Sequence, residues 1–151
     1  MIIHGHRAMH GAFTRHKDQG ISMLFVAKLA RLAGVDELHI GTVVGKMEGE
    51  KDEVMEIRKF LMKPWYGIKR VMHVASGGLH PGLVEALFKM TGKDVVINMG
   101  GGIHGHPKGT EAGARAARQA IELVVKGKSL DEAMRSDKYL ELKEALEKWG
   151  R

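Results

Sequence analysis

The chain has 151 residues, enough for one domain with a buried core, and its 44% hydrophobic content is ordinary for a globular protein. It has no cysteine, so we expect no disulfide and no thiolate metal site. No run comes near the ~20 apolar residues of a membrane span, and no apolar stretch stands at the start of the chain, so we expect no spanning helix and no export signal. These features together predict a cytoplasmic location. The net charge of +6 indicates either an anionic partner or a scattered surface excess, and the few aromatic residues argue against a single-stranded nucleic-acid site.

Short apolar segments alternate with longer amphipathic ones along the chain. The short segments, which we expect to be strands, cover residues 1–6, 36–41, 70–75 and 94–99. The long segments, which we expect to be helices, cover residues 20–33, 51–62, 81–92 and 109–127, with two further helical segments at 129–136 and 138–150.

Each helical segment presents an apolar face at a spacing of three or four residues. The residues predicted to face the core are Met23, Ala27, Ala30, Val54, Ile57, Leu61, Leu83, Leu87, Met90, Ala114, Ala117, Ile121, Val124, Leu142, Leu146 and Trp149. Four strand–helix units in succession predict a parallel sheet that is covered on both faces. We therefore expect an α/β fold with a helical tail.

Histidines and an arginine stand at the end of the first predicted strand, where parallel α/β folds collect functional residues. In the sequence HGHRAMH, His4 and His6 fall on one face because side chains alternate along a strand, and Arg7 follows where a loop begins. Three interpretations are open for the histidine pair: a metal site, a hydrogen-bonded core pair, or a role with an anion or a proton.

The second predicted strand ends in LHIGTVVGKMEGE. His39 lies on this strand, and Gly41 and Gly45 bracket a short loop that delivers Lys46. A lysine on a glycine-hinged loop fits a closing lid, whose ammonium group would neutralise negative charge that develops in a site. The alternative is a solvated surface lysine.

Glycine-rich turns follow the third and fourth predicted strands. In VASGGLHPG, Ser76 is followed by Gly77 and Gly78, and in NMGGGIHGHPKG three glycines run from Gly100. Two such turns at adjacent strand ends can present backbone N–H groups to one anion. The sequence therefore predicts a backbone cradle for phosphate.

The motifs HRAMHGAFTR, LHIGTVVGKMEGE, VASGGLHPG and GGGIHGHPKGT stand in this order and resemble the large subunit of ribulose-1,5-bisphosphate carboxylase/oxygenase (RuBisCO) of the archaeal type. The resemblance covers nearly the whole chain. It implies a parallel (β/α)4 half of a TIM-type (β/α)8 barrel plus C-terminal helices. Residues 1–128 would carry strands five to eight of that barrel, and residues 129–151 would form the helical tail.

The resemblance also implies roles for individual residues. His6 would take part in proton transfer near the reacting carbons, and Lys46 would be the lid lysine that contacts CO₂. Arg7 and His39 would bind one phosphate of the substrate, and Ser76 would bond a substrate hydroxyl. The cradle for the other phosphate would consist of Gly77, Gly78, Gly100 and Gly101.

The parent reaction implied by the resemblance is Mg²⁺-dependent carboxylation of ribulose 1,5-bisphosphate. The Mg²⁺ ligands of the family, a carbamylated lysine and two acidic residues, would lie outside these 151 residues, so the chain is expected to be inactive alone. With His6 on the substrate side, the resemblance leaves His4 as a packing residue. Expected partners are ribulose 1,5-bisphosphate or another phosphate ligand, and a second copy or the other barrel half, but no nucleic acid or membrane. The alternatives are a RuBisCO-like enolase of methionine salvage and a non-catalytic phosphate-binding half-barrel.

Overall fold

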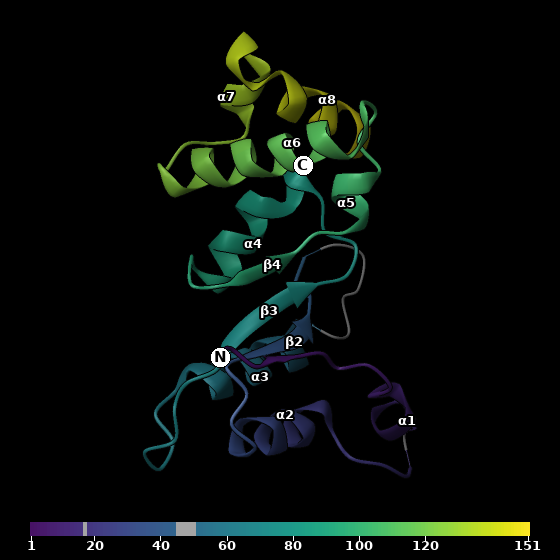
Figure 1. Ribbon diagram of the computed structural model, residues 1–151, viewed down its shortest axis with the longest axis vertical. Coiled ribbons are helices and arrows are strands. Elements are labelled where there is room, and N and C mark those ends of the chain that lie inside the picture. Colours follow the sequence, from purple (N-terminus) through teal and green to yellow (C-terminus); the bar gives the residue numbers. More distant parts are fainter. Residues whose placement is uncertain (17, 45–50) are drawn as a thin grey trace. The chain divides into compact units, whose positions relative to one another are not determined.

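A computed structural model of the protein describes residues 1–16, 18–44 and 51–151 (Figure 1). Contacts divide these residues into two compact units, the first mainly of residues 1–76 and 94–97 and the second mainly of residues 77–93 and 98–151. Each unit has its own core, around Ile40 and Ile57 in the first and around Leu123 and Leu142 in the second. Within the described ranges, no helix is long and apolar enough to cross a membrane.

The first unit is built on a sheet with the strand order β1-β2-β3-β4. The strands are β1 (His4–Gly5), β2 (Glu37–Gly41), β3 (Met72–Ser76) and β4 (Val96–Asn98), of which Asn98 is counted in the second unit. β1 and β2 pair in parallel with His4 opposite Glu37, and β2 and β3 pair in parallel with His39 opposite Val74. The predicted α/β class with four strands is confirmed.

Three helices accompany these strands in the first unit: α1 (Gly11–Thr14), α2 (Met23–Leu32) and α3 (Lys51–Met62). The hydroxyl of Ser22 accepts the Phe25 N–H and so caps the start of α2. The predicted core residues Met23, Ala27, Val54, Ile57 and Leu61 are all buried. Ala30 is only partly buried, and the next residue, Arg31, is fully buried instead.

The buried Arg31 side chain joins α2 to the end of α3 and to the turn that follows. Its guanidinium donates to four backbone carbonyls, those of Phe60 (2.6 Å), Lys63 (2.9 Å), Ile68 (3.0 Å) and Lys69 (2.9 Å). The last carbonyls of a helix have no partner within the helix, so Arg31 satisfies groups that would otherwise need water.

The second unit is helical. Its elements are η1 (Pro81–Leu83), α4 (Val84–Thr91), α5 (Gly101–His104), α6 (Gly109–Val125), α7 (Asp131–Met134), η2 (Asp137–Tyr139) and α8 (Leu140–Trp149). α6 packs against α4, α5 and α8. The predicted stripe on α8 is confirmed for Leu142 and Leu146, which are buried.

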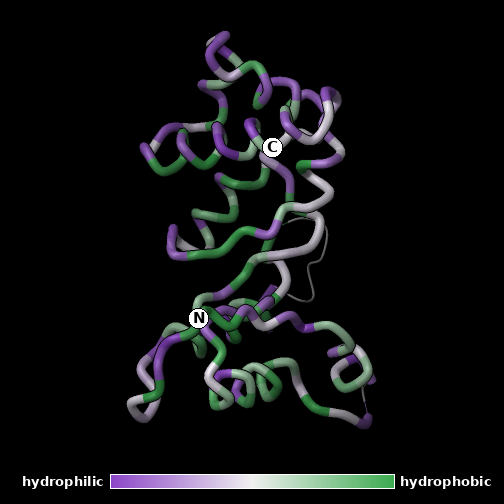
Figure 2. The backbone as a smooth tube through the Cα atoms, in the orientation of Figure 1, coloured by the Kyte–Doolittle hydropathy of each residue, from purple (hydrophilic) through white to green (hydrophobic). Residues whose placement is uncertain are grey.

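The inner face of α6 differs from the prediction. Hydrophilic and hydrophobic residues alternate along this helix (Figure 2), and the buried positions are Gly113, Ala116, Ala117, Ala120 and Leu123. Ala114, which was predicted to face inward, is exposed. The reason is that Gly113 lies against the backbone of Ile103 with no room for a Cβ atom, so the closest packing occurs at the least hydrophobic residue of the face.

The inner face of α4 is also shifted. Leu87 is buried as predicted, but Met90 is 40% exposed and Thr91 is buried in its place. The Thr91 hydroxyl donates to the Leu87 carbonyl oxygen at 2.9 Å, which allows a polar side chain to occupy the core position.

Candidate functional site

The ends of β1, β2 and β3 bring four predicted site residues to one cavity of about 500 Å³ in the first unit. His6 and Arg7 follow β1, His39 lies on β2, and Ser76 ends β3. Arg15, which the sequence did not single out, also lines this cavity, and none of its described lining residues is acidic. We call it the first pocket. Its positive side chains and hydroxyl suit an anionic ligand.

His39 is the most enclosed side chain of the first pocket, with 3% of its surface exposed. Its Nδ1 lies 2.9 Å from Ser76 Oγ, and its Nε2 lies 2.7 Å from His4 Nε2. Burial, followed by the positive charges of His6, His4 and Arg7, lowers the pKa of His39. The ring is therefore neutral at neutral pH and has partners at both nitrogens.

His4 has a different environment from the packing role expected for it. Its side chain is 41% exposed, and its Nδ1 lies 2.5 Å from Glu37 Oε2. The rings of His4 and His6 both meet the His39 ring edge to face, with centroids 4.8 Å and 4.6 Å apart. The two histidines therefore do lie on one side of the sheet, and His4 links a carboxylate to the first pocket.

Gly41 provides the space for the Arg7 guanidinium. The backbone of Gly41 has φ +95°, and a Cβ atom there would lie 2.8 Å from Arg7 Nη2. We expected this glycine to act as a loop hinge, whereas a close approach by Arg7 explains it within the described residues. Beside Arg7, His6 Nδ1 accepts the Ala8 N–H at 3.1 Å, which places the proton of the neutral His6 ring on Nε2.

The glycine turns of the second unit line another cavity, of about 370 Å³, which we call the second pocket. Gly77, Gly78, Gly100 and Gly101 all contribute to it. Gly77 and Gly78 have φ +102° and +65°, in the left-handed region that favours glycine. A Cβ atom at any of these four positions would meet nothing within 4 Å, so their bare backbone faces open space.

The third glycine of the triplet, Gly102, is required for a different reason. A Cβ atom at Gly102 would collide with the Leu79 carbonyl oxygen and the His80 backbone. Internal packing thus accounts for Gly102 only, and Gly100 and Gly101 leave space that a ligand can use. The three consecutive glycines therefore serve two different purposes.

Two aromatic rings at the second pocket were not predicted as site residues. His80 and Trp149 line the pocket, and their rings stack with centroids 5.7 Å apart and planes 23° from parallel. Trp149 ends α8, far along the chain from the glycine turns, and no local sequence signal connects the two. The nearby His106 is structural: its ring bonds the Glu141 carbonyl and the Lys108 N–H.

Two further predictions concern metal ions and the lid. Over the described ranges, no three His, Asp or Glu side chains gather in a way that could hold a metal ion. Lys46, the predicted lid residue, lies outside the residues that the structure describes.

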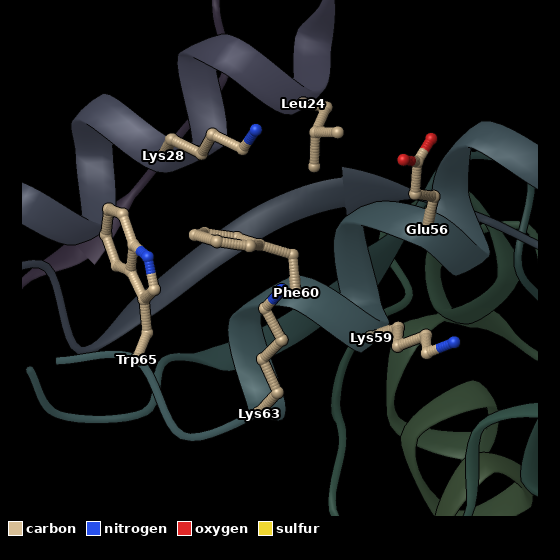
Figure 3. A pocket seen from close by; sticks show the side chains of 7 residues that line it. All are labelled: Leu24, Lys28, Glu56, Lys59, Phe60, Lys63 and Trp65. Carbon is tan, nitrogen blue, oxygen red and sulfur yellow. The ribbon is translucent and has the colours of Figure 1, made fainter.

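A third cavity, of about 400 Å³, lies between α2 and α3 in the first unit. Figure 3 shows Lys28 and Lys63 on either side of the Phe60 ring, with Trp65 beside it. The two ammonium groups lie 5.6 Å and 5.2 Å from the ring centroid, within the range of cation–π contacts. Lys28 thus joins α2 to α3, whereas Lys63 contacts the same ring from just after the end of α3, and we assign the cavity no ligand.

The chain matches known proteins over almost its full length. Residues 1–149 match the family described as "Ribulose bisphosphate carboxylase large chain, catalytic domain". A ribulose bisphosphate carboxylase of Methanocaldococcus jannaschii is 53% identical over 162 residues, which cover 98% of this chain and 38% of that protein.

Two solved structures are similar to the chain. Octameric RuBisCO from Pyrococcus horikoshii matches with a TM-score of 0.91 and 51% identity over 99% of this chain and 35% of that one. Dimeric archaeal RuBisCO from Hyperthermus butylicus matches with a TM-score of 0.87 and 46% identity over 99% of this chain and 37% of that one. These matches confirm the predicted fold class, a parallel (β/α)4 half of a TIM-type barrel plus C-terminal helices.

The chain spans little more than a third of the length of these relatives. Across that length the identity is near one half. The chain belongs to the family of ribulose bisphosphate carboxylase large chains.

Proposed function

We propose that this chain supplies the C-terminal half of the catalytic barrel of a ribulose bisphosphate carboxylase large chain. Residues 1–128 correspond to barrel strands five to eight, and residues 129–151 to the tail. The parent activity is a lyase reaction, the carboxylation of ribulose 1,5-bisphosphate to two molecules of 3-phosphoglycerate. The observation that carries this proposal is the convergence of His6, Arg7, His39 and Ser76 from three successive strand ends on one pocket. None of the described residues that line this pocket is acidic.

In the first pocket, Arg7 binds one phosphate group through charge-assisted hydrogen bonds, and His39 is its second ligand. Because Ser76 and His4 already occupy both ring nitrogens of His39, a phosphate that bonds this ring directly has to replace one of them. His6 lies on the same pocket and serves in proton transfer, and Ser76 bonds a substrate hydroxyl.

In the second pocket, the backbone N–H groups around Gly77, Gly78, Gly100 and Gly101 bind a second phosphate group. The open space above these glycines supports this assignment, since an anion can then approach the backbone directly. Lys46 completes the catalytic set as the lid lysine that stabilises the carboxylated intermediate.

The described donor groups of the first pocket do not fit the Mg²⁺ ion of the parent enzyme. Mg²⁺ is bound mainly by carboxylate and water oxygens, whereas the first pocket is lined by imidazole and guanidinium groups. We therefore derive no step through the metal from these residues.

The 151 residues alone are expected to incorporate no labelled bicarbonate into acid-stable product with ribulose 1,5-bisphosphate and Mg²⁺. Any turnover by pure protein would contradict the assignment of the metal ligands to the remainder of the enzyme.

Phosphate binding tests the proposal directly. Titration calorimetry with ribulose 1,5-bisphosphate should show weak binding that Arg7→Ala and Gly101→Val each reduce by about tenfold or more, the effect of losing one charge-assisted contact. Matched controls are Arg118→Ala, which removes an exposed arginine of α6, and Ala114→Val, which adds bulk at an exposed position. Unchanged affinity in both pocket variants would remove the phosphate assignment.

A further inference from the structure

A second arginine, Arg15, lines the first pocket together with Arg7. It follows the last residue of α1, and both arginines also line an adjoining cavity of about 460 Å³, whose wall includes Ile40 of β2 and Ile57 of α3. All of these residues belong to the first unit. Because the two arginines line both cavities, their side chains lie where the cavities meet, and a ligand in the first pocket meets both of them.

Gly11 shows how the Arg15 side chain lies. A Cβ atom at Gly11 would lie 3.0 Å from Arg15 Nε and 3.1 Å from Arg15 Cδ. Long side chains of a helix point back toward its N-terminus, so Arg15 folds over the residue four positions earlier. Glycine is a poor helix former, and this close approach explains its presence within α1. Gly11 also lines the first pocket, and it makes room for Arg15 as Gly41 does for Arg7.

The charge of Arg15 is available to a ligand. Over the described ranges, Arg15 forms no ion pair with a carboxylate, not even with Glu53, which lines the adjoining cavity. The guanidinium of Arg31, by contrast, is fully engaged with backbone carbonyls. Because Arg15 is exposed, its side chain can turn toward a ligand without leaving an internal partner.

The two phosphate ligands proposed for the first pocket, Arg7 and His39, leave one negative charge of a phosphate group uncompensated. A phosphate monoester carries a charge of about −2 above neutral pH, because its second pKa is about 6. Arg7 supplies one positive charge, whereas burial, followed by nearby positive groups, lowers the pKa of His39 and keeps its ring neutral. Arg15 carries the other guanidinium among the described lining residues and can supply the second charge.

We infer that Arg15 is a further phosphate-binding residue of the first pocket and that it shares one phosphate group of the substrate with Arg7. This inference rests on the proposed function, in which the first pocket takes a phosphate. Two guanidinium groups donate to the phosphate oxygens through charge-assisted hydrogen bonds and match the double negative charge. The pocket thereby favours a phosphate dianion over a singly charged carboxylate.

Titration calorimetry with inorganic phosphate at pH 8 tests this role. The Gly101→Val chain is the reference for all variants, because the added side chain fills open space in the second pocket and leaves the first pocket as the proposed phosphate site. In this reference, Arg15→Gln should raise the dissociation constant about tenfold, the effect of losing one charge-assisted contact. Arg15→Lys keeps the positive charge and should recover most of this loss.

Arg70→Gln is the matched control. Arg70 is an exposed arginine of the same unit that stands before β3, at the opposite end of this strand from the first pocket. The variant removes the same charge from the protein and should leave the dissociation constant unchanged.

Two results would overturn the inference. One is an Arg15→Gln chain that has the circular dichroism of the reference and binds phosphate equally well. The other is an equal loss in Arg15→Gln and Arg15→Lys, which would show that the packing of the side chain over Gly11 matters and its charge does not. If Arg7→Gln weakens binding while Arg15→Gln does not, the proposed function stands and only this inference falls. A reference chain that binds no phosphate would contradict the proposed function itself, on which the inference rests.

Discussion

Gly101 and Gly102 are neighbours in the sequence but meet different surroundings, which gives a prediction for each. Gly102→Ala forces a Cβ atom against the Leu79 carbonyl and should lower the free energy of unfolding by about 2 kcal/mol, as overpacking does. Gly101→Ala places its methyl group in open space on α5 and should leave stability unchanged or slightly raised. Urea unfolding of both variants measures the difference, and equal losses would show that the packing of Gly102 is misassigned.

His73 gives a second prediction at this scale, because neither nitrogen of its buried ring has a hydrogen-bond partner among the residues that the structure describes. Burial lowers the pKa of His73 from 6.5 to about 4. The positive charge of Arg58 also lowers this pKa, whereas the negative charge of Asp94 raises it. The unfolded chain therefore binds more protons between these values. The contribution of the neutral His73 ring to the free energy of unfolding is complete above pH 6.5 and is lost as the pH falls toward 4. Between pH 7.5 and pH 5 the free energy of unfolding should fall by about 2 kcal/mol for this reason.

The variant His73→Leu tests this pH dependence, since it keeps an apolar side chain of similar size at the site. Urea unfolding at pH 7.5 and pH 5 should show a smaller loss of stability for the variant than for the native chain. His16→Leu, at an exposed position, serves as the control and should retain the native loss. Equal losses in all three proteins would mean that His73 titrates normally.

At the scale of elements, the contact between α2 and α3 depends on Arg31. Arg31→Met leaves the carbonyls of Phe60 and Ile68 without their donor and should cost about 3 kcal/mol. Arg31→Lys should recover only part of this loss, because an ammonium group cannot reach four carbonyls with the geometry of a guanidinium. Thermal unfolding, with the exposed Arg135→Met as control, gives the measurement; a native-like melting temperature for Arg31→Met would contradict this role.

The sequence was sufficient to predict the strands and long helices because their hydrophobic pattern is local. On α6 it predicted the burial of Ala117 correctly but was wrong for Ala114, because the helix packs most closely at Gly113, which has no side chain to mark it in a hydrophobic pattern. It placed His6, Arg7, His39 and Ser76 at strand ends that do meet, since parallel strands end at the same edge. It did not assign Glu37 to a site, and it predicted Trp149 to face the core and not a pocket, because partners distant in sequence leave no local pattern.

At the scale of the whole molecule, the sheet formed by the described residues has open edges at β1 and β4. Ile2 and Ile3, which precede β1, are 72% and 46% exposed. Open edges with apolar side chains favour pairing with another chain, and the related structures are described as an octamer and a dimer. We therefore predict that this chain self-associates, through β1 among other contacts.

Light scattering coupled to size-exclusion chromatography should give a mass above that of the 16.6 kDa chain, rising with concentration. Ile2→Lys, which places a charge beside the β1 edge, should shift the equilibrium toward the single chain, and Ile21→Lys, at a partly exposed position before α2, should shift it less. A single species of 16.6 kDa across a wide concentration range would show that the open edges are tolerated.

The chain contains two tryptophans, and they are divided between the two units. Trp65 packs edge to face on Phe60 in the first unit, whereas Trp149 stacks on His80 beside the glycines of the second pocket. Each unit therefore carries its own fluorophore. With Trp65→Phe, the emission that remains comes from the second unit alone, and an anion entering above Gly100 and Gly101 should change its intensity. With Trp149→Phe, the same addition should leave the emission of Trp65 constant, because Trp65 lines the cavity between α2 and α3 and neither of the two phosphate pockets. A comparison of the two variants therefore assigns a fluorescence change to the second pocket.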